Sequence, residues 1–78
     1  MPGPQPSDSD IELLGYVQLT PYPFAKVEDV DKHTTVGYKQ TRNRLDDLAD
    51  KGWLNVRKVG NVNLYWVSDA GLEVLRDN

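Results

Sequence analysis

Residues 37–54, GYKQTRNRLDDLADKGWL, contain the pattern of one complete helix between two glycines. Glycine suits the connections at both ends because it takes backbone angles that other residues avoid. Between the glycines, Leu45 and Leu48, joined by the methyl-bearing Thr41, recur at helical spacing. Such a stripe is typical of a helix that packs one face against a core. The pattern therefore predicts a helix over residues 38–51.

Basic side chains gather in the first half of this helix. Residues 37–45 hold one lysine, two arginines and no acid, and acids return at Asp46. The chain of 78 residues has nine basic and twelve acidic residues and a formal net charge of -3. Two further bases, Arg57 and Lys58, lie close together later in the chain, so everything outside these two stretches sums to -8. Positive charge is therefore concentrated on two short stretches.

The N-terminal part of the chain predicts a tail followed by a first helix. Residues 1–8 are rich in proline and glycine, so we expect a flexible tail there and one domain over residues 9–78. Ser9 with Glu12 three residues later forms a capping-box pattern, which predicts a helix over about residues 10–18.

A break and a second, shorter helix follow. The stretch TPYPF, residues 20–24, has two prolines, which interrupt helical structure and favour an extended backbone around them. We expect residues 24–25 to be extended. A short helix is predicted over residues 27–33, with Val27 and Val30 directed inward.

The C-terminal third predicts a hairpin and a closing helix. Gly60-Asn61 between two apolar stretches is typical of a two-residue type II′ loop, which fixes the register. The pairs counted outward from the loop are Val59 with Val62, Lys58 with Asn63, Arg57 with Leu64, Val56 with Tyr65, Asn55 with Trp66, and Leu54 with Val67. The predicted core face consists of Leu54, Val56, Tyr65 and Val67, and the predicted exposed face includes Val59, Val62, Leu64 and Trp66. Ser68 then caps a short helix that has Leu72 and Leu75 available for burial. The order of elements is that of a small α+β domain.

Residues 27–75 resemble a winged helix-turn-helix domain of the prokaryotic and archaeal transcription-regulator type. The stretch RNRLDDLADKGWL, residues 42–54, is similar to the end of the family's recognition helix: Arg-Leu, two variable residues, Leu, three variable residues, Gly and two apolar residues. The segment YWVSDAGLEVL follows the hairpin, as in that family. The resemblance implies a three-helix core, a two-stranded wing hairpin and a short C-terminal helix.

The resemblance also implies sequence-specific binding of double-stranded DNA by a small transcription regulator. The helix over residues 38–51 would read the major groove, and the wing would contact the backbone or the minor groove. The side chains implied for DNA contact are Tyr38, Lys39, Gln40, Arg42, Asn43, Arg44, Arg57, Lys58, Asn61 and Asn63. A homodimer is expected from the apolar patch on the exposed hairpin face and from the resemblance, because two half-sites are how small readers gain specificity.

Several interpretations stay open at this point. Arg44 either pairs with Asp47, one helical turn on, or touches a phosphate. Tyr38 either stacks on a base or sugar, or folds back over the junction with the preceding helix. The exposed hairpin face, extended by Trp53, is either covered by another segment or marks a partner surface. A partner surface would give the alternative function, a winged-helix protein-interaction module that uses the Trp53/Trp66 face.

Catalytic and metal chemistry is not indicated by the sequence. It shows no nucleophile with a base, no phosphate loop and no metal constellation, so we expect no enzyme, cofactor or metal. His33 is interpreted as a capping or solvated residue, and Asp46, Asp47 and Asp50 as a solvated helix face. There is no cysteine, no signal peptide and no stretch long enough to cross a bilayer, so we expect no membrane association and a soluble, cytoplasmic protein. No small-molecule ligand is evident.

The acidic residues favour aspartate over glutamate by nine to three, which suggests a halophilic surface built for high salt. Thermal stability is then expected to rise from dilute to molar salt, because screening relieves repulsion among the carboxylates. Melting curves followed by circular dichroism at increasing sodium chloride measure the effect. A flat or falling melting temperature would remove the inference.

Overall fold

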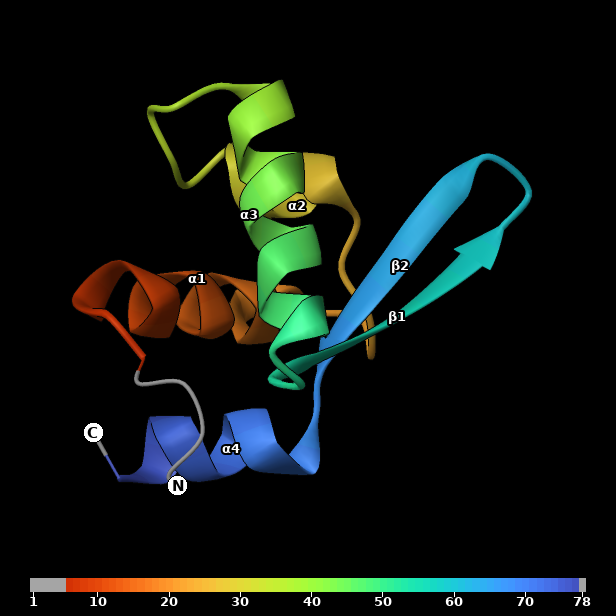
Figure 1. Ribbon diagram of the computed structural model, residues 1–78. Helices are drawn as coiled ribbons and strands as arrows, with labels where there is room; N and C mark the ends of the chain where they lie inside the picture. Colours follow the sequence, from red (N-terminus) through yellow and green to blue (C-terminus); the bar gives the residue numbers. More distant parts are fainter. Residues whose placement is uncertain (1–5, 78) are drawn as a thin grey trace.

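The computed structural model describes residues 6–77, which form four helices and one antiparallel hairpin (Figure 1). In chain order the elements are α1 (Asp8–Leu19), α2 (Val27–Asp31), α3 (Tyr38–Asp50), β1 (Leu54–Val59), β2 (Val62–Val67) and α4 (Asp69–Arg76). The predicted α+β class and the predicted order of elements are confirmed. The bounds of α3 agree with the prediction to one residue, whereas α2 ends two residues earlier than predicted.

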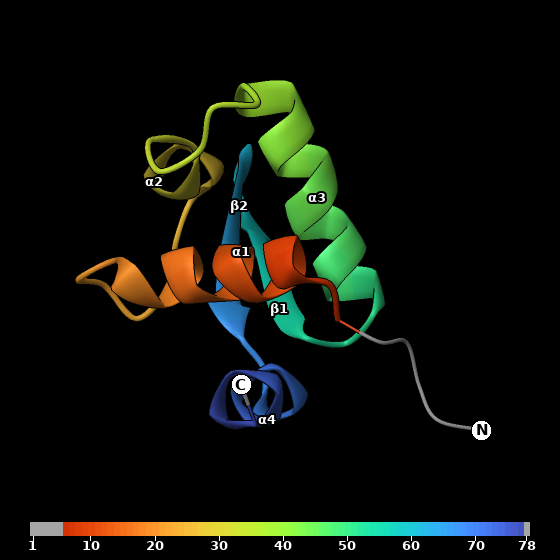
Figure 2. The same cartoon turned by 90° about the vertical axis from the view of Figure 1, so that its left-hand side faces the viewer.

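The helices surround the base of the hairpin (Figures 1 and 2). α2 and α3 lie together at one end, α1 crosses the middle, and α4 lies beneath it. α3 packs on α2 and β1, whereas α1 contacts β2, α2 and α4. The outer half of the hairpin projects away from the helices.

The start of α1 differs from the prediction. The cap is Ser7, whose hydroxyl accepts a hydrogen bond from the Asp10 amide at 3.1 Å, while the Ser7 amide donates to the Asp10 carboxylate at 3.0 Å. This reciprocal pair is a capping box, but it lies at Ser7 and Asp10 and not at Ser9 and Glu12, where the sequence pattern predicts it. Ser7 therefore caps α1 and Asp8 is its first residue, so that neither belongs to a tail, and residues 1–5 lie outside the described residues.

The core forms where α1, α2, α3 and the hairpin base meet. Its fully buried side chains include Leu14, Val30, Leu45, Leu48 and Tyr65. Trp53 is also buried, which corrects the prediction that it extends an exposed face. The Trp53 backbone is held between two helices, because its amide donates to the Leu48 carbonyl of α3 at 3.1 Å and its carbonyl accepts from the Ser68 amide before α4 at 3.0 Å.

A polar network joins α2 to α3 inside this core. The buried Thr41 hydroxyl donates to the Asp31 carboxylate at 3.1 Å and lies 3.1 Å from the Thr34 hydroxyl. Gly37, with φ of 94°, makes the turn before α3, as its position in the sequence predicts. α2 and α3 are therefore connected both by packing and by a buried hydroxyl that has its hydrogen-bond partners.

The register of the hairpin is the predicted one at all six pairs. Gly60 has φ of 61° at the first position of the loop, as a type II′ turn requires. Ala25 adds an isolated bridge to β2, because its amide and carbonyl both bond to the backbone of Tyr65, at 2.7 and 2.8 Å. Val56 was predicted to lie in the core but is 45% exposed, although its partner Tyr65 is fully buried, since β1 is the outer strand and β2 lies between β1 and Ala25.

α4 begins at the predicted cap but buries a different residue. The Ser68 hydroxyl accepts from the Gly71 amide at 3.1 Å, and the Ser68 amide donates to the Trp53 carbonyl at 3.0 Å. Gly71 is buried there, whereas Leu72, which was predicted to be available for burial, is exposed. Leu75 packs partly against the core, as predicted.

Candidate nucleic-acid interface

The first turns of α3 present the four side chains that sequence analysis placed on its outer face. These exposed side chains are Lys39, Gln40, Arg42 and Asn43. They are exposed because Thr41 and Leu45, on the other side of the helix, are buried against α2 and the core. The start of α3 is therefore free to contact a partner along one polar face.

A hollow of about 190 Å³ connects this face to the wing, β1 and β2 with their loop. Five of the predicted DNA-contacting residues line it, namely Tyr38, Arg42, Lys58, Asn61 and Asn63. The other lining residues are Lys26, Val27, Glu28 and Val62. The fold thus brings together side chains that lie some twenty positions apart in the chain.

Lys26 is a member of this hollow that sequence analysis did not assign to DNA contact. It lies directly before α2, and its amide donates to the Asp29 carboxylate at 3.0 Å. Its ammonium group lies 3.2 Å from the Glu28 carboxylate, and this hydrogen bond raises the pKa of Lys26. The only sign of this role in the sequence is that Lys26 directly precedes α2. The winged helix-turn-helix resemblance implies that this helix lies against the DNA backbone.

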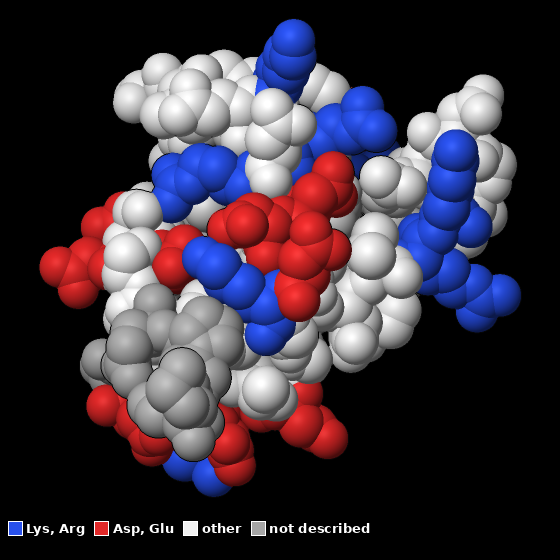
Figure 3. All heavy atoms as spheres, viewed as in Figure 1, with Lys and Arg blue, Asp and Glu red and all other residues white. Residues whose placement is uncertain are grey.

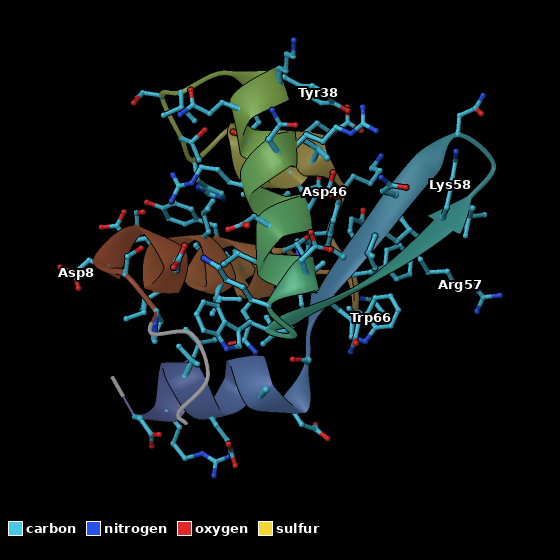
Figure 4. The ribbon with its side chains drawn as sticks, in the orientation of Figure 1. Asp8, Tyr38, Asp46, Arg57, Lys58 and Trp66 are labelled. Carbon is cyan, nitrogen blue, oxygen red and sulfur yellow. The ribbon has the colours of Figure 1, made fainter. Side chains whose placement is uncertain are left out.

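The wing is attached to α3 through a buried phenol. Tyr65 donates from its hydroxyl to the Asp46 carboxylate at 2.7 Å, and the Asn63 amide donates to the same hydroxyl at 3.4 Å. Asp46 lies on the side of α3 that faces the hairpin (Figure 4). The bond therefore helps to set how the wing stands relative to α3.

Alkaline pH is expected to weaken this attachment. Burial, followed by the hydrogen bond to Asp46, raises the pKa of Tyr65 to about 12 from its ordinary value of 10. The folded state holds the phenol proton more tightly than the unfolded chain. The resulting stabilisation is therefore complete below pH 10 and is lost as the pH rises towards 12.

Urea unfolding of the wild type and of Tyr65→Phe at several pH values tests the expectation. The variant should be less stable at pH 8 by about 1 kcal/mol, because it lacks the hydrogen bond to Asp46. Between pH 10 and 12 the wild type should lose stability more steeply than the variant, so that the difference between them shrinks. Parallel curves for the two proteins would contradict the role of Tyr65.

Five predicted DNA-contacting residues do not line the hollow: Lys39, Gln40 and Asn43, which are exposed on α3, and Arg44 and Arg57. Arg57 lies on the opposite side of the hairpin and extends away from the body of the protein (Figure 4). Arg44 turns towards α1 and donates to the Ser9 hydroxyl. Its proposed pairing with Asp47 is not present, because Asp47 pairs with Lys51 at 3.0 Å. The Tyr38 ring is exposed at the edge of the hollow.

The charges separate across the surface. Figure 3 shows lysine and arginine atoms around the start of α3 and over the wing, whereas acidic atoms cover the second half of α3 and the region of α4.

His33 stacks on Tyr16 with ring centres 5.2 Å apart, a contact that the sequence pattern did not reveal. Within residues 6–77 no three acids, histidines or cysteines group as metal ligands, and no helix there has the length and apolarity needed to span a bilayer.

No protein-family model matches the sequence, and no curated protein sequence matches it either. Several solved structures do match its fold. BpsR of Bordetella bronchiseptica, whose DNA binding is regulated by 6-hydroxynicotinic acid, has a TM-score of 0.76 at 15% identity, over 91% of this chain and 51% of that chain. The antimony-specific transcriptional repressor AntR has a TM-score of 0.72 at 24% identity, over 90% and 62% of the two chains. TubR of type III plasmid segregation has a TM-score of 0.75 at 15% identity, over 90% and 71%.

These similarities establish the winged helix-turn-helix fold. α2 and α3 form the helix-turn-helix pair, and the β1–β2 hairpin is the wing. The chain spans about half the length of BpsR.

Proposed function

We propose that this chain binds double-stranded DNA in a sequence-specific manner and acts as a small transcription regulator. The observation that carries the proposal is the hollow in which the start of α3 and the wing present Arg42, Lys58 and three neutral polar or aromatic side chains to one side. In this fold the recognition helix enters the major groove with its N-terminal residues against base edges. The exposed residues in the first turns of α3 are of the types that such a helix needs.

The chemistry of each side chain assigns it a role in the proposal. Arg42 can donate two hydrogen bonds to guanine, whereas Gln40 and Asn43 can pair with adenine. Lys39 can take either guanine or a phosphate. These four residues would carry the base readout.

The wing would contact the adjoining backbone or minor groove. Lys58 supplies the charge for a phosphate contact, and Asn61 and Asn63 supply hydrogen bonds. Lys26 extends this surface at the start of α2. Arg44 and Arg57, which face elsewhere, would be restricted to flanking phosphate contacts or to other roles.

The acidic remainder of the chain favours selective binding. Phosphate contacts supply most of the affinity for DNA of any sequence, and that affinity falls steeply with salt. A chain whose other residues sum to -8 opposes such contacts everywhere except at the basic face. Base contacts would therefore carry a larger share of the affinity.

Similar solved structures support the same proposal. BpsR binds DNA and AntR is a transcriptional repressor. By analogy with regulators that read two half-sites, this chain would act as a homodimer. The alternative of an interaction module built on Trp53 and Trp66 together is not favoured, because Trp53 is buried.

Selection of bound duplexes from a random pool tests the proposal and identifies the operator. Fluorescence anisotropy with the selected duplex should show binding that is tighter than to a shuffled duplex and that weakens as salt increases. Absence of duplex binding at every salt concentration would show that the proposal is wrong.

A further inference from the structure

A second hollow lies between α1 and the turn, residues 32–37, that leads into α3. We call it the α1 hollow. Its volume is about 190 Å³, and it shares no lining residue with the hollow of Arg42 and Lys58. One face of α1, residues 33–36 of the turn and Arg44 of α3 line it. The sequence gave no sign of a ligand here, because these three segments are separated along the chain and only the fold brings them together.

The walls of the α1 hollow are joined to one another by side-chain contacts. Ser9, Glu12 and Tyr16 recur at helical spacing, so they lie on one face of α1. The Tyr16 ring stacks on the His33 ring with centres 5.2 Å apart, which joins α1 to the turn. The Arg44 guanidinium donates to the Ser9 hydroxyl, which joins α3 to α1. The lining is therefore held in place before any ligand binds, and this lowers the cost of binding.

Two opposite charges line the α1 hollow without pairing with each other. Within residues 6–77 the Arg44 side chain makes one hydrogen bond, to Ser9, and no ion pair. The Glu12 carboxylate makes neither a hydrogen bond nor an ion pair with those residues. The α1 hollow thus offers one cation and one anion to a ligand.

This arrangement of charges selects the ligand by its own charge. A simple anion would be attracted by Arg44 but repelled by Glu12, and a simple cation would meet the reverse. A neutral ligand would displace water from both charged groups and compensate neither. A molecule with a carboxylate for Arg44 and an ammonium group for Glu12 compensates both. Arginine is also suited to hold a carboxylate through two parallel hydrogen bonds.

The size of the α1 hollow and its remaining lining narrow the class further. A volume of about 190 Å³ is below the roughly 300 Å³ at which pockets for drug-sized ligands begin, and it equals that of roughly six water molecules. Tyr16 and Thr35 supply hydroxyls that have no hydrogen-bond partner within residues 6–77, and Leu13 and Val36 supply apolar surface. A carboxylate and an ammonium group on a skeleton of this size describe a small α-amino acid.

We propose that the α1 hollow binds a small free α-amino acid, with its carboxylate at Arg44 and its ammonium group at Glu12. The ligand would lie against residues 33–36, which connect α2 to α3. The inference goes beyond the proposed function, and its test uses no DNA.

Titration of the isotope-labelled full chain with L-alanine, L-serine and L-valine, followed by amide chemical shifts, tests the site. At least one of the three should shift the amides of residues 9–16 and 33–36 and approach saturation by about 10 mM. Propionate lacks the ammonium group and ethylamine lacks the carboxylate. Each should bind at least about 10-fold more weakly than the amino acid, because it leaves one charged group of the hollow without a partner.

Glu12→Gln and Arg44→Gln each remove one charge from the α1 hollow. Each should weaken binding of the tightest of the three amino acids by about 10-fold or more. Glu73→Gln and Arg76→Gln are the matched controls, since they remove the same charges from exposed positions on α4 outside the hollow. Both controls should bind like the wild type, and circular dichroism should show all four variants folded.

The inference is wrong if none of the three amino acids shifts these amides, or if propionate or ethylamine binds as tightly as the amino acid. It is also wrong if folded Glu12→Gln binds undiminished, or if the α4 controls lose affinity equally. Arg44 is half-buried, so if Arg44→Gln fails to fold, the variant of the exposed Glu12 decides the result. Absence of duplex binding would contradict the proposed function alone, and absence of amino-acid binding would contradict the α1 hollow alone.

Discussion

Arg42→Ala is expected to lower affinity for the selected duplex by roughly 5- to 150-fold, a loss that fluorescence anisotropy measures directly. A bidentate arginine–guanine contact contributes about 1–3 kcal/mol, and each 1.4 kcal/mol is a factor of ten. Arg42 is the residue with the strongest expected effect because it lies both on the outer face of α3 and in the hollow shared with the wing. The fold and the oligomeric state should not change, since the side chain is exposed.

Arg76→Ala provides a matched control for charge. Arg76 is also an exposed arginine, but it lies in the last turn of α4, away from the hollow. Its replacement should change affinity only slightly. Equal losses for the two variants would mean that net charge, and not a specific contact, determines binding. An unchanged affinity for Arg42→Ala would remove the assignment of Arg42 to base readout.

Gly71→Ala is expected to lower the unfolding free energy by about 3 kcal/mol or more, at the upper end of overpacking costs. A Cβ atom at this position would lie 2.1 Å from the Trp53 carbonyl oxygen and 2.7 Å from a methyl group of Val67. This carbonyl is a backbone group, and it also accepts a hydrogen bond from the Ser68 amide. It therefore cannot move aside without disturbing the start of α4. Domains of this size have total stabilities of only about 4–12 kcal/mol, so the loss would be severe.

Gly15→Ala separates this steric effect from the general effect of removing a glycine. Gly15 also lies in a helix, but nothing approaches within 4 Å of the position its Cβ would take. This variant should gain about 0.5–1 kcal/mol, because alanine is the better helix former. Urea unfolding of both variants should therefore give changes of opposite sign. Similar stabilities for the two would show that α4 can shift away from Trp53 at little cost.

Most of the fold follows from local patterns that point to the same answer. The Gly60-Asn61 loop and the alternation around it suffice for the hairpin register, because a shift by one residue would reverse both faces. The helical stripe of Leu45 and Leu48 likewise suffices to orient α3. Ser7 was missed as the cap of α1 because two serines stand close together, and each has an acid three residues later.

The errors concern how far one element extends over another. Val56 has a core pattern, but its place on the outer strand β1 leaves it 45% exposed opposite the fully buried Tyr65. Trp53 is buried where the start of α4 packs against its backbone, a tertiary contact that no local pattern encodes. The same limit applies to the interface, since Arg57 and Lys58 are neighbours in sequence but point to opposite sides of the hairpin. The meeting of Lys26 with the wing is a tertiary contact with only a weak signal in the sequence.

The backbone bridge between Ala25 and Tyr65 fixes the base of the wing, so that any change in the orientation of the wing is a rotation about this pair. Tyr65 is fixed there through its amide, its carbonyl and its phenol, whereas the chain beyond it extends freely to Gly60. Five residues of strand correspond to an arm of about 16 Å. A rotation of about 10° about the Ala25–Tyr65 pair would therefore move the loop at Gly60 by about 3 Å, the length of one hydrogen bond. In the proposed complex, the angle at which Ala25 and Asp46 hold Tyr65 would determine which atoms of the duplex the tip reaches.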